Sequence, residues 1–402
     1  MMYVFRAMGQ EPWARALVRL SEIIPGRSAA EVEGVYADLY AALSKAGYAD
    51  LFEAAAAGLL YGESALARAG SGLPALPEGL LVGARRDLAA LLALFRRDLR
   101  GEVTDIVGEA VPPLEHLSTG SSKEVRDFAG ILCTADADTV LENLLGAYRT
   151  NGTGDLARFP AFRWSGGALH GVLHPAWAEA RRLVGLGRQL ERLYANTEAF
   201  LAGRAGQHTL LYGPRGSGKS TALRSLGGRY AEAGLRLVEV VPESLVELPT
   251  ILEALRGRPH HYLLFVDDLA FEAESRAYGP LKSLLEGSLG GRPANVLVYA
   301  TSNRRHLVTE RFSDRPDPLN GDVHAWDTQH ERLALADRFG LVLTFPDATQ
   351  RRYLEIVRGL AARDGVEDGD LEPKAVRFAE WGNGYSGRTA QQFVEALRSG
   401  LV

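Results

Sequence analysis

The stretch LLYGPRGSGKST (210–221) decides the fold of this chain. It carries an apolar run into a glycine-rich turn and restarts as a predicted helix at Lys219. It fits the pattern G-x-x-x-x-G-K-[ST], with Gly213 first, Gly218 sixth, and then Lys219 and Ser220. Glycine allows backbone dihedrals that point several N–H groups inward, and it lets anionic oxygens approach the chain closely. The stretch therefore predicts a phosphate-binding loop, and an ordinary glycine-rich strand–helix turn is the alternative.

Each part of this loop has a chemical reason. The helix that begins at Lys219 directs its positive end at the same place as the inward N–H groups. Lys219 supplies a mobile positive charge for the β- and γ-phosphates, and Ser220 offers a hydroxyl to Mg²⁺. The predicted nucleotide-binding residues of the loop are Gly213, Pro214, Arg215, Gly216, Ser217, Gly218, Lys219, Ser220 and Thr221.

Polar residues also follow two later apolar runs. HYLLFVDDL (261–269) is a predicted strand that ends in Asp267 and Asp268. Ligands bind outside the carboxyl ends of strands in open α/β sheets. We expect Asp267 to hold Mg²⁺ and Asp268 to polarise the attacking water, whereas a solvated strand end is the alternative. Asn303 ends the next predicted strand, where it is placed to bind the γ-phosphate or to orient the water.

Around these motifs, apolar strands alternate with helical patterns from about residue 180 onward. This alternation predicts a mostly parallel sheet that is covered by helices on both faces. The fold class is therefore α/β, a P-loop parallel sheet between helices. We expect a nucleotide-binding core at 180–345 and a small helical lid at 346–402. The Gly-, Pro- and His-rich segment 151–179 is interpreted as a linker.

Residues 1–150 show helical periodicity throughout. Leu17, Leu20 and Ile24 share one face of a predicted helix. A second stripe is formed by Leu88, Leu91, Leu92 and Phe95. No long strand-like alternation interrupts these patterns, so we expect an all-helical N-terminal domain without chemistry of its own.

The composition narrows the class of protein. The net charge is −5, from 45 Lys and Arg against 50 Asp and Glu, and gives no global attraction to nucleic acid or to an anionic membrane. Cys133 is the single cysteine; it fits a reducing compartment, and we expect its thiol to be buried. Because neither a signal peptide nor an apolar membrane span is indicated, we expect a cytoplasmic protein.

Taken together, the motifs resemble those of the AAA+ ATPases. The phosphate loop is GPRGSGKS (213–220), the Walker A motif, the Mg²⁺ strand is LLFVDD (263–268), and the sensor-1 strand is YATSN (299–303). The resemblance covers about residues 180–400. It implies an AAA+ core with a C-terminal helical lid, ATP and Mg²⁺ as cofactors, and ATP hydrolysis. Several segments look more closely like a bacterial AAA+ ATP-binding family of unassigned function, of which VDDLAFE (266–272) is one.

Two arginines gain a role from this resemblance. LADRFGLVL (335–343) looks like the segment that carries the arginine finger, with Arg338 as the finger. YSGRTAQQFVEAL (385–397) looks like sensor 2, with Arg388 facing the nucleotide. A finger that acts in trans implies a homo-oligomer, either a ring or a head-to-tail assembly. A surface arginine that pairs with Asp337 is the alternative for Arg338.

One departure from the family pattern concerns hydrolysis. Many AAA+ enzymes have Asp-Glu where this chain has Asp267 and Asp268, and the shorter side chain reaches less far toward the water. Glu272, four residues beyond Asp268, is the second candidate for the same role. Slow turnover is therefore expected.

Three functions follow from these expectations. The first is an Mg²⁺-dependent ATPase that remodels an unidentified protein client. The second is a nucleotide-gated switch, loader or adaptor with little turnover. The third is a nucleic-acid motor, which the acidic net charge disfavours.

Overall fold

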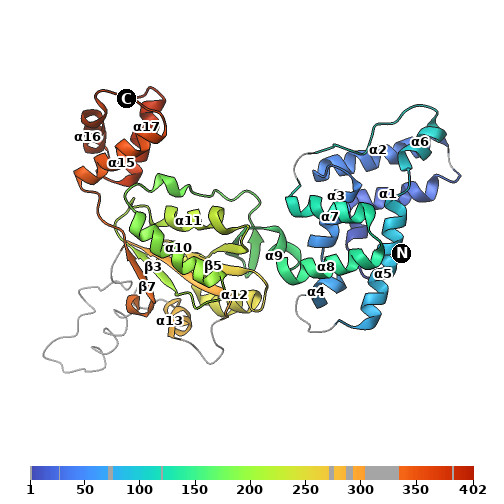
Figure 1. The fold of residues 1–402 in the computed structure, drawn as a ribbon, viewed down its shortest axis with the longest axis horizontal. Helices are drawn as coiled ribbons and strands as arrows, with labels where there is room; N and C mark the ends of the chain where they lie inside the picture. The colour runs from blue at the N-terminus through green and yellow to red at the C-terminus, as the bar shows by residue number, and fades with distance from the viewer. Residues whose placement is uncertain are drawn as a thin grey trace. The chain divides into compact units, whose positions relative to one another are not determined.

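The fold is given by a computed structural model, which describes residues 2–26, 28–70, 76–118, 121–270, 276–286, 293–303, 335–382 and 384–402. The chain divides into two compact units, Met1–Arg158 and Phe159–Val402 (Figure 1). Each unit has its own apolar core.

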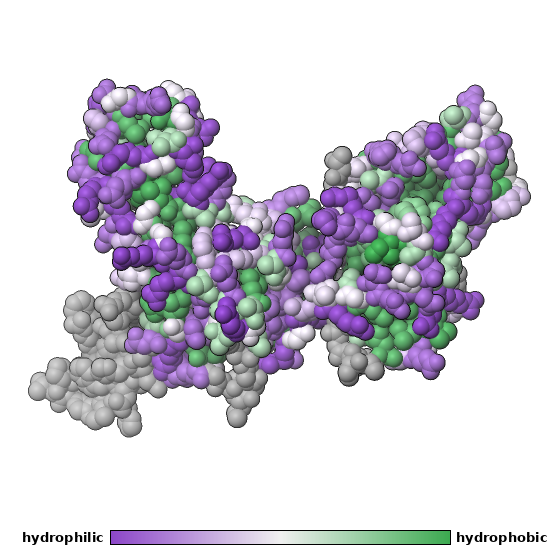
Figure 2. Space-filling model, in the orientation of Figure 1, coloured by the Kyte–Doolittle hydropathy of each residue, from purple (hydrophilic) through white to green (hydrophobic). Residues whose placement is uncertain are grey.

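The first unit is helical in its described part. Its elements are η1 (Met8–Gln10), α1 (Pro12–Ile23), α2 (Ala29–Ala46), α3 (Leu51–Tyr61), α4 (Ala65–Gly70), α5 (Glu78–Phe95), α6 (Leu99–Val107), α7 (Lys123–Thr134), α8 (Ala137–Asn151) and α9 (Gly154–Arg158). The predicted stripes face the core: Leu17 and Leu20 are buried on α1, as are Leu88 and Phe95 on α5. Figure 2 shows hydrophilic residues over much of the visible surface of this unit. The helices of its described residues confirm the prediction of an all-helical N-terminal domain.

Local signals explain where several of these helices begin. Asp50, Ser122 and Asp136 each precede a helix, and each side chain accepts a hydrogen bond from a backbone N–H of the first turn. Such N-caps satisfy donors that have no partner within the helix. The prediction for Cys133 was wrong, because this residue lies on the outer side of α7 and its side chain is exposed. None of the described helices is long and apolar enough to cross a membrane.

The second unit is built on a seven-stranded sheet. Its strands are β1 (Ala161–Ser165), β2 (Ala168–Gly171), β3 (Thr209–Tyr212), β4 (Leu235–Glu239), β5 (His261–Val266), β6 (Val296–Ser302) and β7 (Leu341–Thr344). Their order is β2-β1-β4-β5-β6-β3-β7, and neighbouring strands are parallel except for the β1–β2 pair. The central strands β5 and β6 are buried nearly throughout, which explains their continuous apolar runs.

Helices cover both faces of this sheet, as predicted. They are α10 (Gly187–Leu201), α11 (Lys219–Tyr230), α12 (Leu248–Leu255) and α13 (Tyr278–Glu286), with the short turns η2 (Ala180–Arg182), η3 (Pro242–Glu247) and η5 (Ala336–Arg338). Figure 1 shows α10 and α11 on one face and α12 and α13 on the other. Because the strands are parallel, the loops that follow β3, β5 and β6 emerge at the same edge of the sheet.

The interpretation of 151–179 as a linker needs correction. Strands β1 and β2 lie in this segment, and β1 extends the sheet by pairing with β4. Gly166 and Gly167 join them with φ values of 58° and 77°, which suit a tight hairpin turn. Phe162 and Trp164 are buried whereas Arg163 is exposed, so alternation was present but too short to be recognised.

The lid prediction at 346–402 matches a three-helix cluster. Its helices are α15 (Gln350–Arg363), α16 (Leu371–Trp381) and α17 (Gly387–Arg398). Tyr353, Val357 and Phe393 form the centre of its separate core. The helix α17 begins at Gly387 because Ser386 caps it, accepting a hydrogen bond from the backbone N–H of Thr389.

Candidate functional site

The glycine-rich loop after β3 has a conformation that requires glycine at two positions. Gly213 and Gly218 have φ values of 155° and 98°. A Cβ on Gly213 would overlap the carbonyl oxygen of Phe345, and one on Gly218 would lie 2.7 Å from Cδ2 of Leu183. The loop therefore packs so closely against Phe345 and Leu183 that side chains at Gly213 and Gly218 have no room.

Lys219 is the first residue of α11, and its ammonium group is held inside the loop. Nζ donates hydrogen bonds to the carbonyl oxygens of Gly213 and Pro214, at 2.6 and 2.8 Å, and to Oδ1 of Asn303 at 2.8 Å. Burial lowers the pKa of Lys219 from its usual value, against the opposing effect of Asp267 and Asp268. The ammonium group of Lys219 is thus held by three uncharged oxygen acceptors, and the oxygens of a phosphate can take their place.

The carboxylate of Asp267 lies directly beside the loop. Its Oδ1 accepts hydrogen bonds from Oγ of Ser220 and from Oγ1 of Thr301, both at 2.6 Å. Arg224 of α11 lies 3.9 Å from Oδ2. The predicted pair of Mg²⁺-binding residues, Ser220 and Asp267, is therefore in direct contact.

Asp268 has an unusual backbone. Its φ of 53° lies in the left-handed region, which costs free energy for a residue with a side chain. The backbone N–H donates to Oγ1 of Thr301 at 2.9 Å, and Oδ1 accepts a hydrogen bond from Nδ2 of Asn303 at 2.6 Å. Arg215 lies 4.0 Å from the other carboxylate oxygen. Asn303 thus links Lys219 to Asp268.

The chemistry of these groups fits a phosphate and a divalent cation. The hydroxyl oxygen of Ser217 is buried within the loop and has no hydrogen-bond partner among the described residues. The positive end of α11 points at the same place. The described residues contain no group of three or more metal-binding side chains. Mg²⁺ is commonly bound by one or two carboxylates together with substrate phosphates, so Asp267 and Ser220 suffice on the protein side.

The lid contacts the phosphate loop at the start of α17. A Cβ added to Gly216 would lie 3.0 Å from Ser386 and 3.5 Å from Cβ of Arg388. A Cβ on Gly387 would lie 2.9 Å from the carbonyl oxygen of Gly216. Arg388 is exposed beside the loop. The predicted sensor residue is therefore adjacent to the predicted phosphate site in the same unit.

A short segment at 179–186, the strap, runs between the phosphate loop and the lid. Leu183 and Leu186 face Gly218 of the loop. On the lid side, the carbonyl oxygen of Gly185 accepts a hydrogen bond from Arg352 at 2.9 Å.

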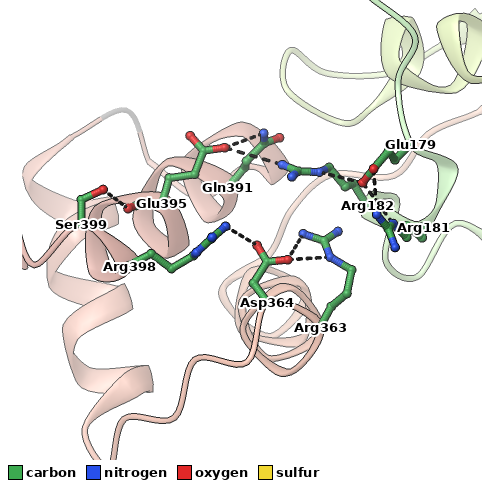
Figure 3. A network of polar contacts seen from close by, with 9 residues as sticks. All are labelled: Glu179, Arg181, Arg182, Arg363, Asp364, Gln391, Glu395, Arg398 and Ser399. Atoms are coloured by element: carbon green, nitrogen blue, oxygen red, sulfur yellow. Dashed lines mark hydrogen bonds and ion pairs between the residues drawn. The ribbon is translucent and has the colours of Figure 1, made fainter.

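Figure 3 shows the polar contacts between the strap and the lid. Arg182 lies 3.6 Å from Glu395 of α17 and also donates to Glu179. Within the lid, Asp364 accepts hydrogen bonds from Arg363 and lies 3.7 Å from Arg398. The pair of Arg182 and Glu395 is largely open to solvent and contributes little to stability, whereas the side chain of Asp364 is only 12% exposed.

Arg338 lies away from the phosphate loop of its own chain. It precedes β7, whose first residue Leu341 pairs with Thr209 at the start of β3. The loop follows the other end of β3, a strand length of roughly 13 Å away. Nε of Arg338 donates to Oε1 of Glu286 at 2.6 Å, so Glu286 is an ion-pair partner that the sequence analysis did not consider. Glu272 lies outside the described residues, and its role stays a prediction.

Sequence reasoning missed two members of this site. Thr301 lies in the quoted segment YATSN, near the end of β6 and two residues before Asn303, which follows the strand. That spacing was the available signal. Arg224 follows Lys219 by five residues on α11, and no pattern in the sequence pointed to it.

Comparison with known proteins adds the family. Residues 157–401 match the family described as "Protein of unknown function (DUF815)". The chain belongs to this family. Its phosphate loop, parallel sheet and helical lid agree with the resemblance to AAA+ proteins that the sequence motifs indicate. No curated protein matches the sequence.

Solved structures of two AAA+ proteins are similar to part of the chain. The Thermotoga maritima RuvB Holliday junction branch migration motor is 18% identical, with a TM-score of 0.35 over 54% of this chain and 62% of that one. The Aeropyrum pernix Orc1 protein in complex with DNA is 16% identical, with a TM-score of 0.38 over 55% and 65%. The chain thus spans less than two thirds of either protein.

Proposed function

We propose that this protein is an Mg²⁺-dependent AAA+ ATPase that binds and hydrolyses ATP and thereby remodels a macromolecular partner. One observation carries the proposal. Lys219, Ser220, Asp267, Asp268 and Asn303 are joined through Thr301 in a continuous set of hydrogen bonds at the tips of three neighbouring strands. A structural role alone gives no reason to gather a buried cation, two carboxylates and a strained backbone at one sheet edge.

The residues divide the work of binding. The backbone N–H groups of 213–220 and the ammonium of Lys219 would hold the phosphates. Ser220 and Asp267 would hold Mg²⁺, which when bound neutralises charge on the β- and γ-phosphates. Leu183, which is half-buried beside Gly218, offers an apolar side chain next to the loop, and Leu186 is buried behind it.

Hydrolysis requires that Asp268 become available. Its carboxylate would accept a hydrogen bond from the attacking water and draw off its proton. In the structure, Oδ1 of Asp268 accepts a hydrogen bond from Nδ2 of Asn303, whose Oδ1 in turn accepts one from Lys219. A γ-phosphate that attracts Lys219 and Asn303 would break this chain of contacts. Asn303 and Arg388 would in this way sense the phosphate, with Glu272 as the second candidate for activating the water.

Arg338 would complete the site of a neighbouring subunit. Its place at the opposite end of β3 and β7 prevents it from reaching its own phosphate loop, and this favours action in trans. Its guanidinium would exchange Glu286 for the γ-phosphate of the neighbour, in a ring or head-to-tail oligomer. We further propose that the helical unit 1–158 recognises a protein client.

A second candidate function is a nucleotide-gated switch with little turnover. The 2.6 Å contact between Asp268 and Asn303 favours it, because a restrained carboxylate activates water poorly. Phosphate release separates the two candidates. Sustained release that rises with protein concentration favours the oligomeric ATPase, whereas a single burst favours the switch.

The binding step is tested by calorimetry of the full chain with Mg²⁺ and a non-hydrolysable ATP analogue. Lys219→Ala should weaken binding by about 100-fold, because it removes a charge-assisted contact to phosphate. Lys374→Ala is the matched control, since Lys374 pairs with Asp368 within the lid. If wild type takes up no analogue, or if both variants bind equally well, the proposed function is wrong.

The client is sought by affinity capture with Asp268→Asn, which should bind ATP without hydrolysing it. We expect a protein retained with this variant in ATP and released in ADP. Recovery of the chain alone would argue against remodelling.

A further inference from the structure

We propose that Thr301 is a positioning residue, whose hydroxyl sets both the metal-binding carboxylate of Asp267 and the backbone turn at Asp268. The inference deepens the proposed function and rests on it, because it concerns the same Mg²⁺–ATP site. It concerns a residue on β6, the strand beside the two acidic residues.

The hydroxyl of Thr301 lies between the two aspartates. Thr301 is 1% exposed, so water cannot replace its hydrogen bonds. Its Oγ1 lies 2.6 Å from Oδ1 of Asp267 and 2.9 Å from the backbone nitrogen of Asp268. Its carbonyl oxygen accepts a third bond, from the N–H of Leu269 at 2.7 Å.

The direction of these hydrogen bonds is fixed by chemistry. The N–H of Asp268 is a donor without acceptor capacity, so the hydroxyl oxygen must accept there. A hydroxyl has one proton, which it then donates to the carboxylate of Asp267. The hydrogen bonds therefore run in one direction only. The Asp268 amide donates to the Thr301 hydroxyl, and that hydroxyl donates to the Asp267 carboxylate.

The same chain explains the strained turn. Asp268 has a φ of 53°, a conformation that persists where surrounding contacts determine it. The bonds from the N–H groups of Asp268 and Leu269 to Thr301 both restrain this turn. The turn in turn aims the Asp268 carboxylate at Asn303. A single threonine therefore couples the residue proposed to hold Mg²⁺ to the residue proposed to activate water.

Thr301 differs from Ser220 in this arrangement. Both hydroxyls donate to Oδ1 of Asp267. Ser220 is the residue proposed to turn its oxygen to Mg²⁺, which leaves Thr301 as the bond that keeps Asp267 in place when the metal binds. Thr301 thus acts through Asp267 and Asp268 and needs no contact with the nucleotide.

The test compares Thr301→Val, Thr301→Ser and Thr197→Val in the full chain. Valine keeps the shape of threonine but removes the hydroxyl, and serine restores it. Thr197→Val is the control, because Thr197 of α10 is also fully buried, but its hydroxyl lies 2.9 Å from the carbonyl oxygen of Leu193 and 3.1 Å from the hydroxyl of Tyr299, whereas that of Thr301 bonds to the two aspartates. Circular dichroism verifies that each variant is folded.

The first measurement is binding of a non-hydrolysable ATP analogue by calorimetry, with and without Mg²⁺. Thr301→Val should bind the metal-free analogue with the same affinity as wild type. The increase in affinity that Mg²⁺ causes should be about tenfold smaller than in wild type. Turnover should show a kcat lower by about 10–100-fold, because the water-activating carboxylate is misplaced, and a KM raised by up to about tenfold, because Mg²⁺–ATP is held less tightly. Thr301→Ser should recover both values to within threefold.

A second readout needs no nucleotide. Amide hydrogen exchange at Asp268 should be faster in Thr301→Val than in wild type and in Thr197→Val. The inference is overturned if wild type binds and hydrolyses Mg²⁺–ATP while Thr301→Val keeps its Mg²⁺ dependence and kcat, or if serine fails to rescue. If wild type itself takes up no nucleotide, the proposed function fails first, and exchange at Asp268 still reports whether the contact exists.

Discussion

Asp87 in the helical unit and Asp267 in the sheet unit both accept several hydrogen bonds, but from different donors. The carboxylate of Asp87 is 2% exposed and accepts from the backbone N–H groups of Tyr3, Val4 and Phe5, at 2.7–3.2 Å. Asp267 is partly exposed and accepts from the hydroxyls of Ser220 and Thr301. Backbone donors are fixed by the fold, whereas a hydroxyl can rotate toward another partner. The bonds to Asp87 therefore hold residues 3–5 in place, whereas the hydroxyls beside Asp267 can turn to another partner.

The same contrast holds for other polar groups. In the helical unit, the hydroxyl of Tyr148 donates to the carbonyl oxygen of Leu59, a fixed contact between α8 and α3. At the phosphate loop, Lys219 uses carbonyl oxygens and the amide of Asn303, all of which a phosphate can replace. Function in this molecule is therefore expected where buried polar groups have exchangeable partners.

The largest expected effect is on turnover and concerns Arg338, whose partner Glu286 we regard as exchangeable. Arg338→Ala should bind ATP as wild type does but hydrolyse it roughly 10³-fold more slowly, as loss of an arginine finger does. Mixing Arg338→Ala with Lys219→Ala should restore part of the activity, because one subunit supplies an intact nucleotide site and the other an intact arginine. Steady-state phosphate release measures both.

Full turnover by Arg338→Ala would reject the role in trans. Glu286→Gln is the control for the ion pair itself. It removes the negative charge that pairs with Arg338 while leaving the arginine, so turnover should be kept or raised.

The second effect is on stability and concerns the fixed carboxylate. Asp87→Ala should lower the free energy of unfolding of the helical unit by about 3 kcal/mol, because three backbone N–H groups lose a charged acceptor. Nucleotide affinity should not change. Urea denaturation followed by circular dichroism gives the free energy, and Asp105→Ala, an exposed position on α6, is the control. A nucleotide-binding defect in Asp87→Ala would contradict the contrast drawn between the units.

The third effect compares two helical glycines. Gly227 of α11 faces Trp177, and a Cβ there would overlap the indole ring, whereas nothing lies within 4 Å of a Cβ on Gly146 of α8. Gly227→Ala should cost about 1–3 kcal/mol of unfolding free energy, because the ring has to move. Gly146→Ala should instead stabilise by about 0.5–1 kcal/mol. Thermal denaturation measures both, and a stabilised Gly227→Ala would show that Trp177 is not held there.

The smallest effect is electrostatic and concerns the strap. Hydrogen bonds from Arg181, and then from Arg182, lower the pKa of Glu179 to about 2 from a usual value of 4.5. A carboxyl whose pKa is lowered by folding contributes stability above pH 4.5 and loses it as the pH falls toward 2. Arg181→Gln should move the titration midpoint of Glu179 back toward 4.5, as followed by NMR of its side-chain carbon. An unchanged midpoint would show that Arg181 is not the main cause of the lowered pKa of Glu179.

Much of the candidate site could be predicted from sequence because its parts are local. The loop 213–220 specifies its own turn and the helix start, and each buried strand specifies where its terminal polar residue emerges. The hairpin at 161–171 was missed because it shows so few alternating residues and because its place is fixed by pairing with β4, in which Ala161 lies opposite Leu237, 76 positions away. Thr301 was missed because a threonine in a strand carries no signal until its neighbours are known.

The sequence by itself determined the phosphate loop, the parallel sheet, the helical N-terminal unit and the lid, since turn chemistry and the periodicity of buried residues act over a few positions. The tertiary structure alone decided which polar groups meet. It paired Arg338 with Glu286, brought Arg388 to Gly216, and joined Asp267 to Asp268 through Thr301. The physical reason is that a hydrogen bond depends on distances of a few tenths of an ångström between residues that are far apart in the chain, and only strand order and register fix those distances.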